Sequence, residues 1–130
     1  MIQTNYKNVW LAFVQITAED GFSFEDLVES DEEETEKTDK YIGAWANILI
    51  KANTINEALE IVPQGLSEKN FIVLFIDKIE NVESLIEYDE LDLKIIEEIN
   101  WLLSTEYVFM ISDKIFPYIK SEQVINRFHY

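Results

Sequence analysis

Residues 41–66, YIGAWANILIKANTINEALEIVPQGL, decide the fold of this chain, because a strand pattern leads directly into a helix pattern. The side chains of a strand alternate between the two faces of a sheet. Small and aliphatic residues hold the even positions and predict a buried face: Ile42, Ala44, Ala46, Ile48, Ile50 and Ala52. Aromatic and polar residues share the odd positions and predict a face that is only partly covered: Tyr41, Gly43, Trp45, Asn47, Leu49 and Lys51.

A helix is predicted to begin at Thr54, because Thr54 and Glu57 have the spacing of a capping box. The apolar residues that follow fall on one helical face: Ile55, Ala58, Leu59 and Val62. Pro63 and Gly65 interrupt this pattern, so the regular helix is expected to end near Val62 or after one distorted turn.

The rest of the chain predicts three more strands and one more helix. The strands are runs with apolar side chains on one or both faces: Val9–Thr17, Phe71–Ile79 and Glu106–Ser112. The second helix is Asp89–Ser104, with a stripe of Ile95, Ile96, Ile99, Leu102 and Leu103. Phe22–Glu29 fits a short helical turn, Asn81–Tyr88 fits either a continuing edge or a turn, and the tail from Asp113 looks irregular.

This order of elements predicts a single small α+β domain spanning residues 1–130. We expect a mixed sheet of about four strands with two helices on one face, as in a variant of the ferredoxin-like arrangement. The start of the chain lacks the basic and apolar pattern of a signal peptide, and its apolar runs are too short to span a bilayer. The sequence therefore predicts a soluble, cytoplasmic domain.

The net charge of the chain limits the classes of molecule that it is expected to bind. The chain has 26 Asp and Glu against 10 Lys and Arg, a formal net charge of -16. Nucleic-acid binding depends on basic side chains that neutralise phosphates, so this composition argues against direct binding of DNA or RNA. It equally opposes binding to an anionic membrane and favours association with a basic protein.

The negative charge is concentrated between Glu19 and Lys40, where 11 acidic residues face two lysines for a segment charge of -9. Its centre has no apolar side chain to bury, which predicts an acidic, mobile loop at about residues 29–40. Two interpretations of this loop stay open, a solubilising excursion and a surface that binds a cationic partner. On the second interpretation the candidate partner-binding residues are Asp31, Glu32, Glu33, Glu34, Glu36, Tyr41 and Trp45. Trp45 is the candidate anchor, because tryptophan is enriched at the energetic centres of interfaces.

No catalytic, cofactor-binding or metal-binding motif is recognisable. The chain has no cysteine, and its single histidine, His129, has no second histidine for a metal set or a triad. The three glycines are too far apart to form a phosphate-binding loop. The expectation is a protein without enzymatic activity, cofactor or metal, and an enzyme that uses scattered carboxylates ranks behind the two binding functions described next.

The run Tyr41–Asn47, followed by Lys51-Ala52 and by Glu57-Ala58 on the helix, resembles the strand and helix of immunity proteins from bacterial polymorphic toxin systems. The resemblance extends over roughly residues 9 to 80. It implies a non-enzymatic cytoplasmic inhibitor that binds and neutralises a cognate toxin, often a basic nuclease. The alternative is a regulatory or adaptor domain that self-associates or binds another protein through its partly exposed sheet or an edge strand.

Overall fold

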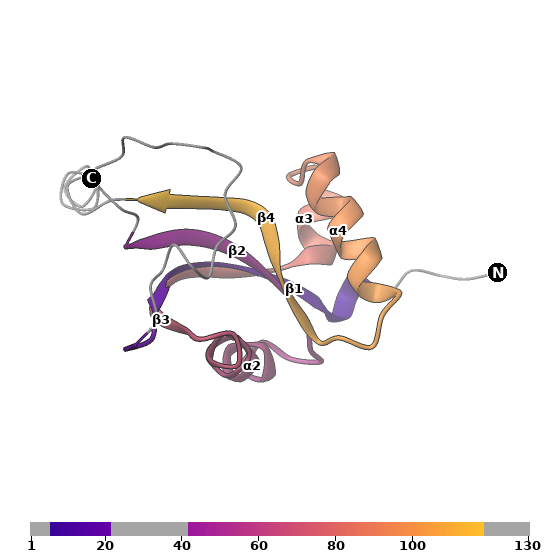
Figure 1. The fold of residues 1–130 in the computed structure, drawn as a ribbon. Coiled ribbons are helices and arrows are strands. Elements are labelled where there is room, and N and C mark those ends of the chain that lie inside the picture. Colours follow the sequence, from indigo (N-terminus) through magenta and orange to yellow (C-terminus); the bar gives the residue numbers. More distant parts are fainter. Residues whose placement is uncertain (1–5, 22–41, 119–130) are drawn as a thin grey trace.

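The computed structural model describes residues 6–21 and 42–118, which form one small α+β domain around a four-stranded antiparallel sheet (Figure 1). The elements in chain order are the 3-10 helix η1 (Tyr6–Asn8), β1 (Val9–Ala18), β2 (Gly43–Lys51), α2 (Ile55–Ser67), β3 (Phe71–Asn81), α3 (Val82–Glu87), α4 (Leu93–Leu103) and β4 (Phe109–Tyr118). The strand order is β3-β1-β2-β4, so β1 and β2 are central and β3 and β4 are the edges.

The α+β class and the four strands are confirmed, but two details of the prediction are wrong. Every pair of neighbouring strands is antiparallel, so the sheet is not mixed. The helices do not share one face, since α2 packs on one side of the sheet and α4 packs on the other (Figure 1). The sheet is therefore the middle of three layers at the end that α4 covers. In the part of the chain described, no helix is long and apolar enough to cross a membrane.

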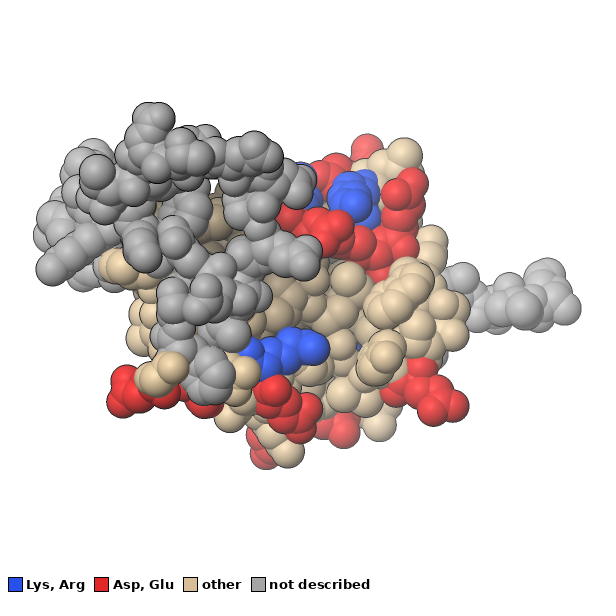
Figure 2. Space-filling view, viewed as in Figure 1, with Lys and Arg blue, Asp and Glu red and all other residues tan. Residues whose placement is uncertain are grey.

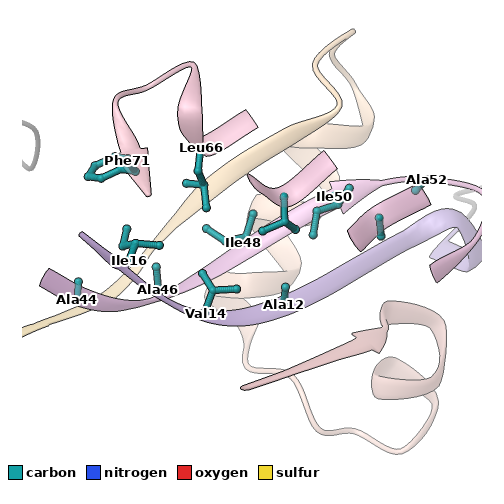
Figure 3. Close-up of a cluster of buried hydrophobic side chains, with 12 residues drawn as sticks. Ala12, Val14, Ile16, Ala44, Ala46, Ile48, Ile50, Ala52, Leu66 and Phe71 are labelled. Carbon is teal, nitrogen blue, oxygen red and sulfur yellow. The ribbon is translucent and has the colours of Figure 1, made fainter. Parts of the chain in front are cut away.

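We call the sheet surface under α2 the closed face. Its strand residues are buried and are predominantly alanine, valine and isoleucine, and most of them are labelled in Figure 3: Ala12, Val14, Ile16, Ala44, Ala46, Ile48 and Ile50. The pairing places Ala12 opposite Ile48 and Val14 opposite Ala46, so small and larger side chains alternate under Val62 and Leu66 of the helix. The prediction of a buried even face is confirmed from Ala44 to Ala52. It is wrong for Ile42, which precedes β2 and is 38% exposed.

The helix α2 begins where the sequence predicts. The Thr54 side chain accepts a hydrogen bond from the Glu57 amide at 3.1 Å, and the Glu57 carboxylate accepts one from the Asn53 amide at 2.7 Å. Of the two expected ends, the one near Val62 is wrong and the one a turn later is close to the structure, because the helix continues through Pro63 to Ser67. Pro63 costs about 3 kcal/mol within a helix, and burial of the following turn, through Leu66 on the closed face, offsets this cost.

Two other boundaries differ from the expectation. Val82–Glu87 is a short helix, capped by Asn81, and not a continuing strand. The tail is regular as far as Tyr118, because β4 pairs with β2 from Phe109 to Tyr118 and tolerates Pro117 at the sheet edge. The expected turn at Phe22–Glu29 and the acidic loop at residues 29–40 lie outside the described residues.

Candidate protein-binding face

The second face of the sheet is covered at one end only. Leu49 of β2 is fully buried there against Ile95, Ile99 and Leu102 of α4. The sequence grouped Leu49 with the partly covered positions, and this grouping is wrong for Leu49 because α4 lies directly over it. Towards the other end of β2 the same face carries Trp45, which is only half-buried. We call this end the open half-face.

Contacts with β4 hold α4 over the covered end. The buried Glu98 accepts hydrogen bonds from the Ser112 hydroxyl at 2.6 Å and from the Asp113 amide at 2.9 Å. These residues occupy the irregular part of β4, where its register with β2 shifts. Because these contacts fix the position of α4, the helix covers Leu49. It does not cover the part of the sheet beyond Asn47, where Trp45 lies.

Two exposed ion pairs reinforce this attachment. Lys114 lies 2.6 Å from the Asp92 carboxylate, and Lys94 lies 3.2 Å from Asp113. The hydrogen bond from Lys114, followed by that from the Ile95 amide, lowers the pKa of Asp92 below 3.8. The hydrogen bond to Asp113 raises the pKa of Lys94 above 10.5. Both pairs are exposed to solvent, so their contribution to stability is small and sensitive to salt.

The open half-face carries five aromatic rings. Tyr118 of β4 is buried and accepts a hydrogen bond from the Gln15 side chain at 2.6 Å, and the other four rings come one from each strand of the sheet. We call these four rings the aromatic cluster: Phe75 of β3, Phe13 of β1, Trp45 of β2 and Phe116 of β4. Phe13 and Trp45 are stacked, with centroids 5.3 Å apart and an angle of 15° between the rings. Phe75 meets the Trp45 ring edge-on at 6.3 Å, and Phe116 meets the Phe13 ring edge-on at 6.4 Å.

Cross-strand pairing brings these rings together. Trp45 lies opposite Phe116 on β4 and opposite Gln15 on β1, and Gln15 lies in turn opposite Phe75 on β3. Two irregularities in the β1–β3 register flank this position, and such bulges redirect the side chains beside them. The outer rings remain accessible, since Phe75 is 53% and Phe116 is 51% exposed. Exposed aromatic surface of this kind is typical of interaction sites and makes the open half-face the candidate binding surface.

Of the predicted partner-binding residues, the described residues include Trp45 alone. Asp31, Glu32, Glu33, Glu34, Glu36 and Tyr41 lie outside them. Trp45 does lie on the partly covered face, but it is half-buried between Phe13 and Phe75. It forms the centre of the cluster, and the most exposed rings are the two that flank it.

Sequence reasoning missed Phe13, Phe75 and Phe116 as members of one site. Phe13 and Phe75 each stand in a run that is apolar on both faces, so alternation alone does not distinguish an exposed ring from a core ring. Phe116 falls in the stretch that the sequence assigned to an irregular tail. Only the strand order and the register place the three rings beside Trp45.

A groove adjoins the aromatic cluster at Phe13. It has a volume of about 340 Å³ and lies between the sheet and the segment around α3, with Leu11, Asn47 and Leu85 in its lining. A second, separate surface lies at the far end of α4, where Trp101 and Tyr107 stack at 5.9 Å and are 50% and 64% exposed. Trp101 is exposed because it lies outside the buried stripe of α4.

The described residues contain no group of three or more His, Cys, Asp or Glu side chains placed to hold a metal ion. Comparison of the chain with protein-family models, with curated proteins and with solved structures found no match. The resemblance to immunity proteins therefore rests on the sequence pattern alone, and the aromatic cluster with its groove is the site that the fold itself presents.

Proposed function

We propose that this protein is a non-enzymatic binding domain that neutralises a basic protein partner, as an immunity protein neutralises its toxin. The observation that carries the proposal is the aromatic cluster, in which each of the four strands places one ring on a sheet face that α4 leaves open. The cluster would cover the surface through which the partner acts. Inhibition would then follow from occlusion alone and would need no chemistry from this chain.

The cluster suits recognition because its position is fixed by the core behind it. Phe13 and Trp45 belong to the two central strands, whose opposite face is packed under α2. Aromatic side chains bury a large area on binding and lose little conformational freedom, and tryptophan is among the residues that dominate interface energies. A rigid platform of this kind would bind without first having to become ordered.

Charge supports a basic partner. The chain carries a formal charge of -16, and acidic side chains surround much of the outline of the described part in Figure 2. Such a field accelerates the approach of a cationic protein and repels anionic ones. Asp31, Glu32, Glu33, Glu34 and Glu36 would add to this attraction during the encounter.

The test begins with the protein that co-purifies with this chain from its native cell. The activity of that purified partner is then measured with and without a stoichiometric amount of this protein. Phe75→Ala/Phe116→Ala should weaken binding by about tenfold to a hundredfold and leave the fold intact, because both rings are about half exposed. Trp45 is a poorer choice, since it is half-buried and its loss would also disturb packing.

Trp101→Ala/Tyr107→Ala is the matched control, because it removes an exposed aromatic pair from the other end of the molecule. Its binding should equal that of the parent. Inhibition that persists unchanged in the Phe75→Ala/Phe116→Ala variant would show that the aromatic cluster is not the binding surface. A partner that keeps full activity in the complex would rule out neutralisation.

The edge strand β3 favours a second candidate function, an adaptor domain that self-associates. Among the described strands β3 has only β1 as a neighbour, and its first six residues, 71–76, carry no charge. Ile72 and Leu74 are 40% and 50% exposed on it, and exposed apolar edges pair readily with further strands. Light scattering over a range of concentrations tests this function: a dimer that Leu74→Lys converts to a monomer would support it, and a monomer throughout would reject it.

A further inference from the structure

The groove beside the aromatic cluster combines an apolar interior with an acidic rim. Leu11 and Phe13 of β1 line it together with Leu85 of α3 and Leu91 of the segment that follows α3. Its volume of about 340 Å³ exceeds that of any single amino-acid side chain. The apolar part is therefore large enough to receive the aliphatic stem of one long side chain from another protein.

The remaining lining is rich in hydrogen-bond acceptors. Asp77, Glu80 and Glu90 contribute carboxylates, and Lys78 is the only basic residue in the lining, which gives a formal charge of -2. Lys78 lies 3.7 Å from Glu80, and both side chains are exposed, so this pair is weak and can rearrange. Asp77 and Glu90 form no ion pair with any residue in the described part of the chain.

Asn47 adds a neutral acceptor. Its side-chain nitrogen donates to the Lys114 carbonyl at 2.9 Å, which fixes the direction of the amide. No donor within residues 6–21 and 42–118 reaches its Oδ1. A donor that enters the groove thus meets acceptors from both Asn47 and the acidic rim.

We propose that this groove binds the guanidinium side chain of an arginine supplied by the partner. The proposal rests on the proposed function, because the ligand is part of the protein that this chain is inferred to neutralise. A guanidinium group presents five N–H donors in a plane, forms paired hydrogen bonds with a carboxylate and stacks on an aromatic ring. One face of the Phe13 ring is stacked on Trp45, and the ring also lines the groove, so it can contribute a cation–π contact.

The test uses the full chain with leucine methyl groups labelled for NMR, titrated with N-acetyl-arginine amide. Resonances of Leu11, Leu85 and Leu91 should shift in a saturable way, with Kd in the range of about 1–20 mM expected for so small a ligand. N-acetyl-citrulline amide has the same shape without the charge and should shift them much less. N-acetyl-lysine amide should bind more weakly than the arginine ligand, since it cannot form the paired hydrogen bonds.

Glu80→Gln/Glu90→Gln should weaken arginine binding by about threefold to fivefold, as expected for the loss of two exposed charge contacts. The matched control is Glu83→Gln/Glu87→Gln, which removes the same charge from exposed positions of α3 that do not line the groove. It should bind arginine as the parent does. Equal weakening in both variants, equal binding of citrulline, or stronger binding of lysine would each overturn the arginine site.

This result is separable from the proposed function. If the groove resonances do not respond to arginine while inhibition of the partner still depends on Phe75 and Phe116, the arginine site is wrong and the binding function stands. If arginine binds in the groove but the co-purified partner is not inhibited, the groove is a site for basic side chains and neutralisation is wrong.

Discussion

The two faces of the sheet use the same strands for different purposes. On the closed face, alanine, valine and isoleucine are completely buried under α2, and no ring from β1 or β2 other than the partly buried Trp10 packs there. On the open half-face, the intervening positions carry Phe13 and Trp45, with the half-exposed Phe75 and Phe116 beside them. Because strand side chains alternate, one strand can stabilise the fold with one set of residues and present a binding surface with the other. Because of this separation, the core and the proposed binding surface can be mutated independently.

The difference arises from how the helices are attached. α2 has 13 residues, which gives a helix of about 20 Å, and it is connected at both ends to strands of the sheet it covers. α3 has six residues and α4 has 11, and α4 is anchored to β4 through Glu98 and Ser112. This anchor holds α4 over Leu49, so Trp45 and its neighbours remain outside the apolar cluster that α4 forms with Leu49. Substitutions on the two faces, and at the contacts that attach the helices, test this difference.

The largest effect should come from placing a charge on the closed face. Ile48 is fully buried at the centre of that face, and Ile48→Asp should destabilise the protein by more than about 4 kcal/mol, because the carboxylate would have no partner. The matched change on the open half-face, Phe116→Asp, should cost only about 1–2 kcal/mol, since the ring is half exposed on an edge strand. Urea unfolding followed by circular dichroism measures both. Similar costs for the two variants would show that the faces do not differ as described.

The next effect concerns the anchor of α4. Ser112→Ala removes the hydroxyl that donates to the buried Glu98 at 2.6 Å and should destabilise the protein by about 2 kcal/mol. Ser104→Ala is the control, because its hydroxyl bonds to the Trp101 carbonyl at an exposed helix end, and it should cost less than about 1 kcal/mol. Equal unfolding free energies for the two variants would mean that Glu98 does not hold α4 in place.

A smaller effect is expected where α2 approaches β4. A β-carbon at Gly65 would lie 2.6 Å from the Phe109 ring, so Gly65→Ala forces the ring or the helix to move. Alanine is the better helix former by about 1 kcal/mol, and this gain partly cancels an overpacking cost of about 1–3 kcal/mol. A net loss of about 1 kcal/mol should be measured in urea. Adding Phe109→Leu should reduce the loss caused by Gly65→Ala relative to the Phe109→Leu parent, and an unchanged loss would exclude the ring contact as its cause.

The sequence predicted the closed face better than the open one, for a physical reason. Local patterns determine a strand such as β2 and the cap at Thr54, and a buried face needs only apolar residues at alternate positions. The prediction of the open half-face depended on long-range pairing. Phe75 and Phe116 join Trp45 only through the order β3-β1-β2-β4 and the register of the edge strands. The same lack of long-range information explains two wrong predictions. Both helices were expected on one face of the sheet, and the last strand was expected to end before Asp113.

The smallest effect should come from the exposed ion pair of Asp92 and Lys114, which supports α4 over the covered end of the second face. Lys114 lowers the pKa of Asp92 in the folded protein below its ordinary value of 3.8, so the folded state favours the charged carboxylate. The resulting stability is present above pH 3.8 and is lost as the pH falls through the lower folded pKa.

Asp92→Asn keeps an N-cap side chain that can accept from the Ile95 amide, and it removes only the charge. The variant should therefore lose less stability than the parent on acidification below about pH 4, and the difference should shrink in high salt because the pair is exposed. Urea midpoints measured across the acid range at low and high salt test this, with Glu87→Gln as the control for removing one exposed carboxylate. If Asp92→Asn and the parent lose stability in parallel, the ion pair does not help to hold α4, and its position over Leu49 depends on Glu98 and the apolar stripe alone.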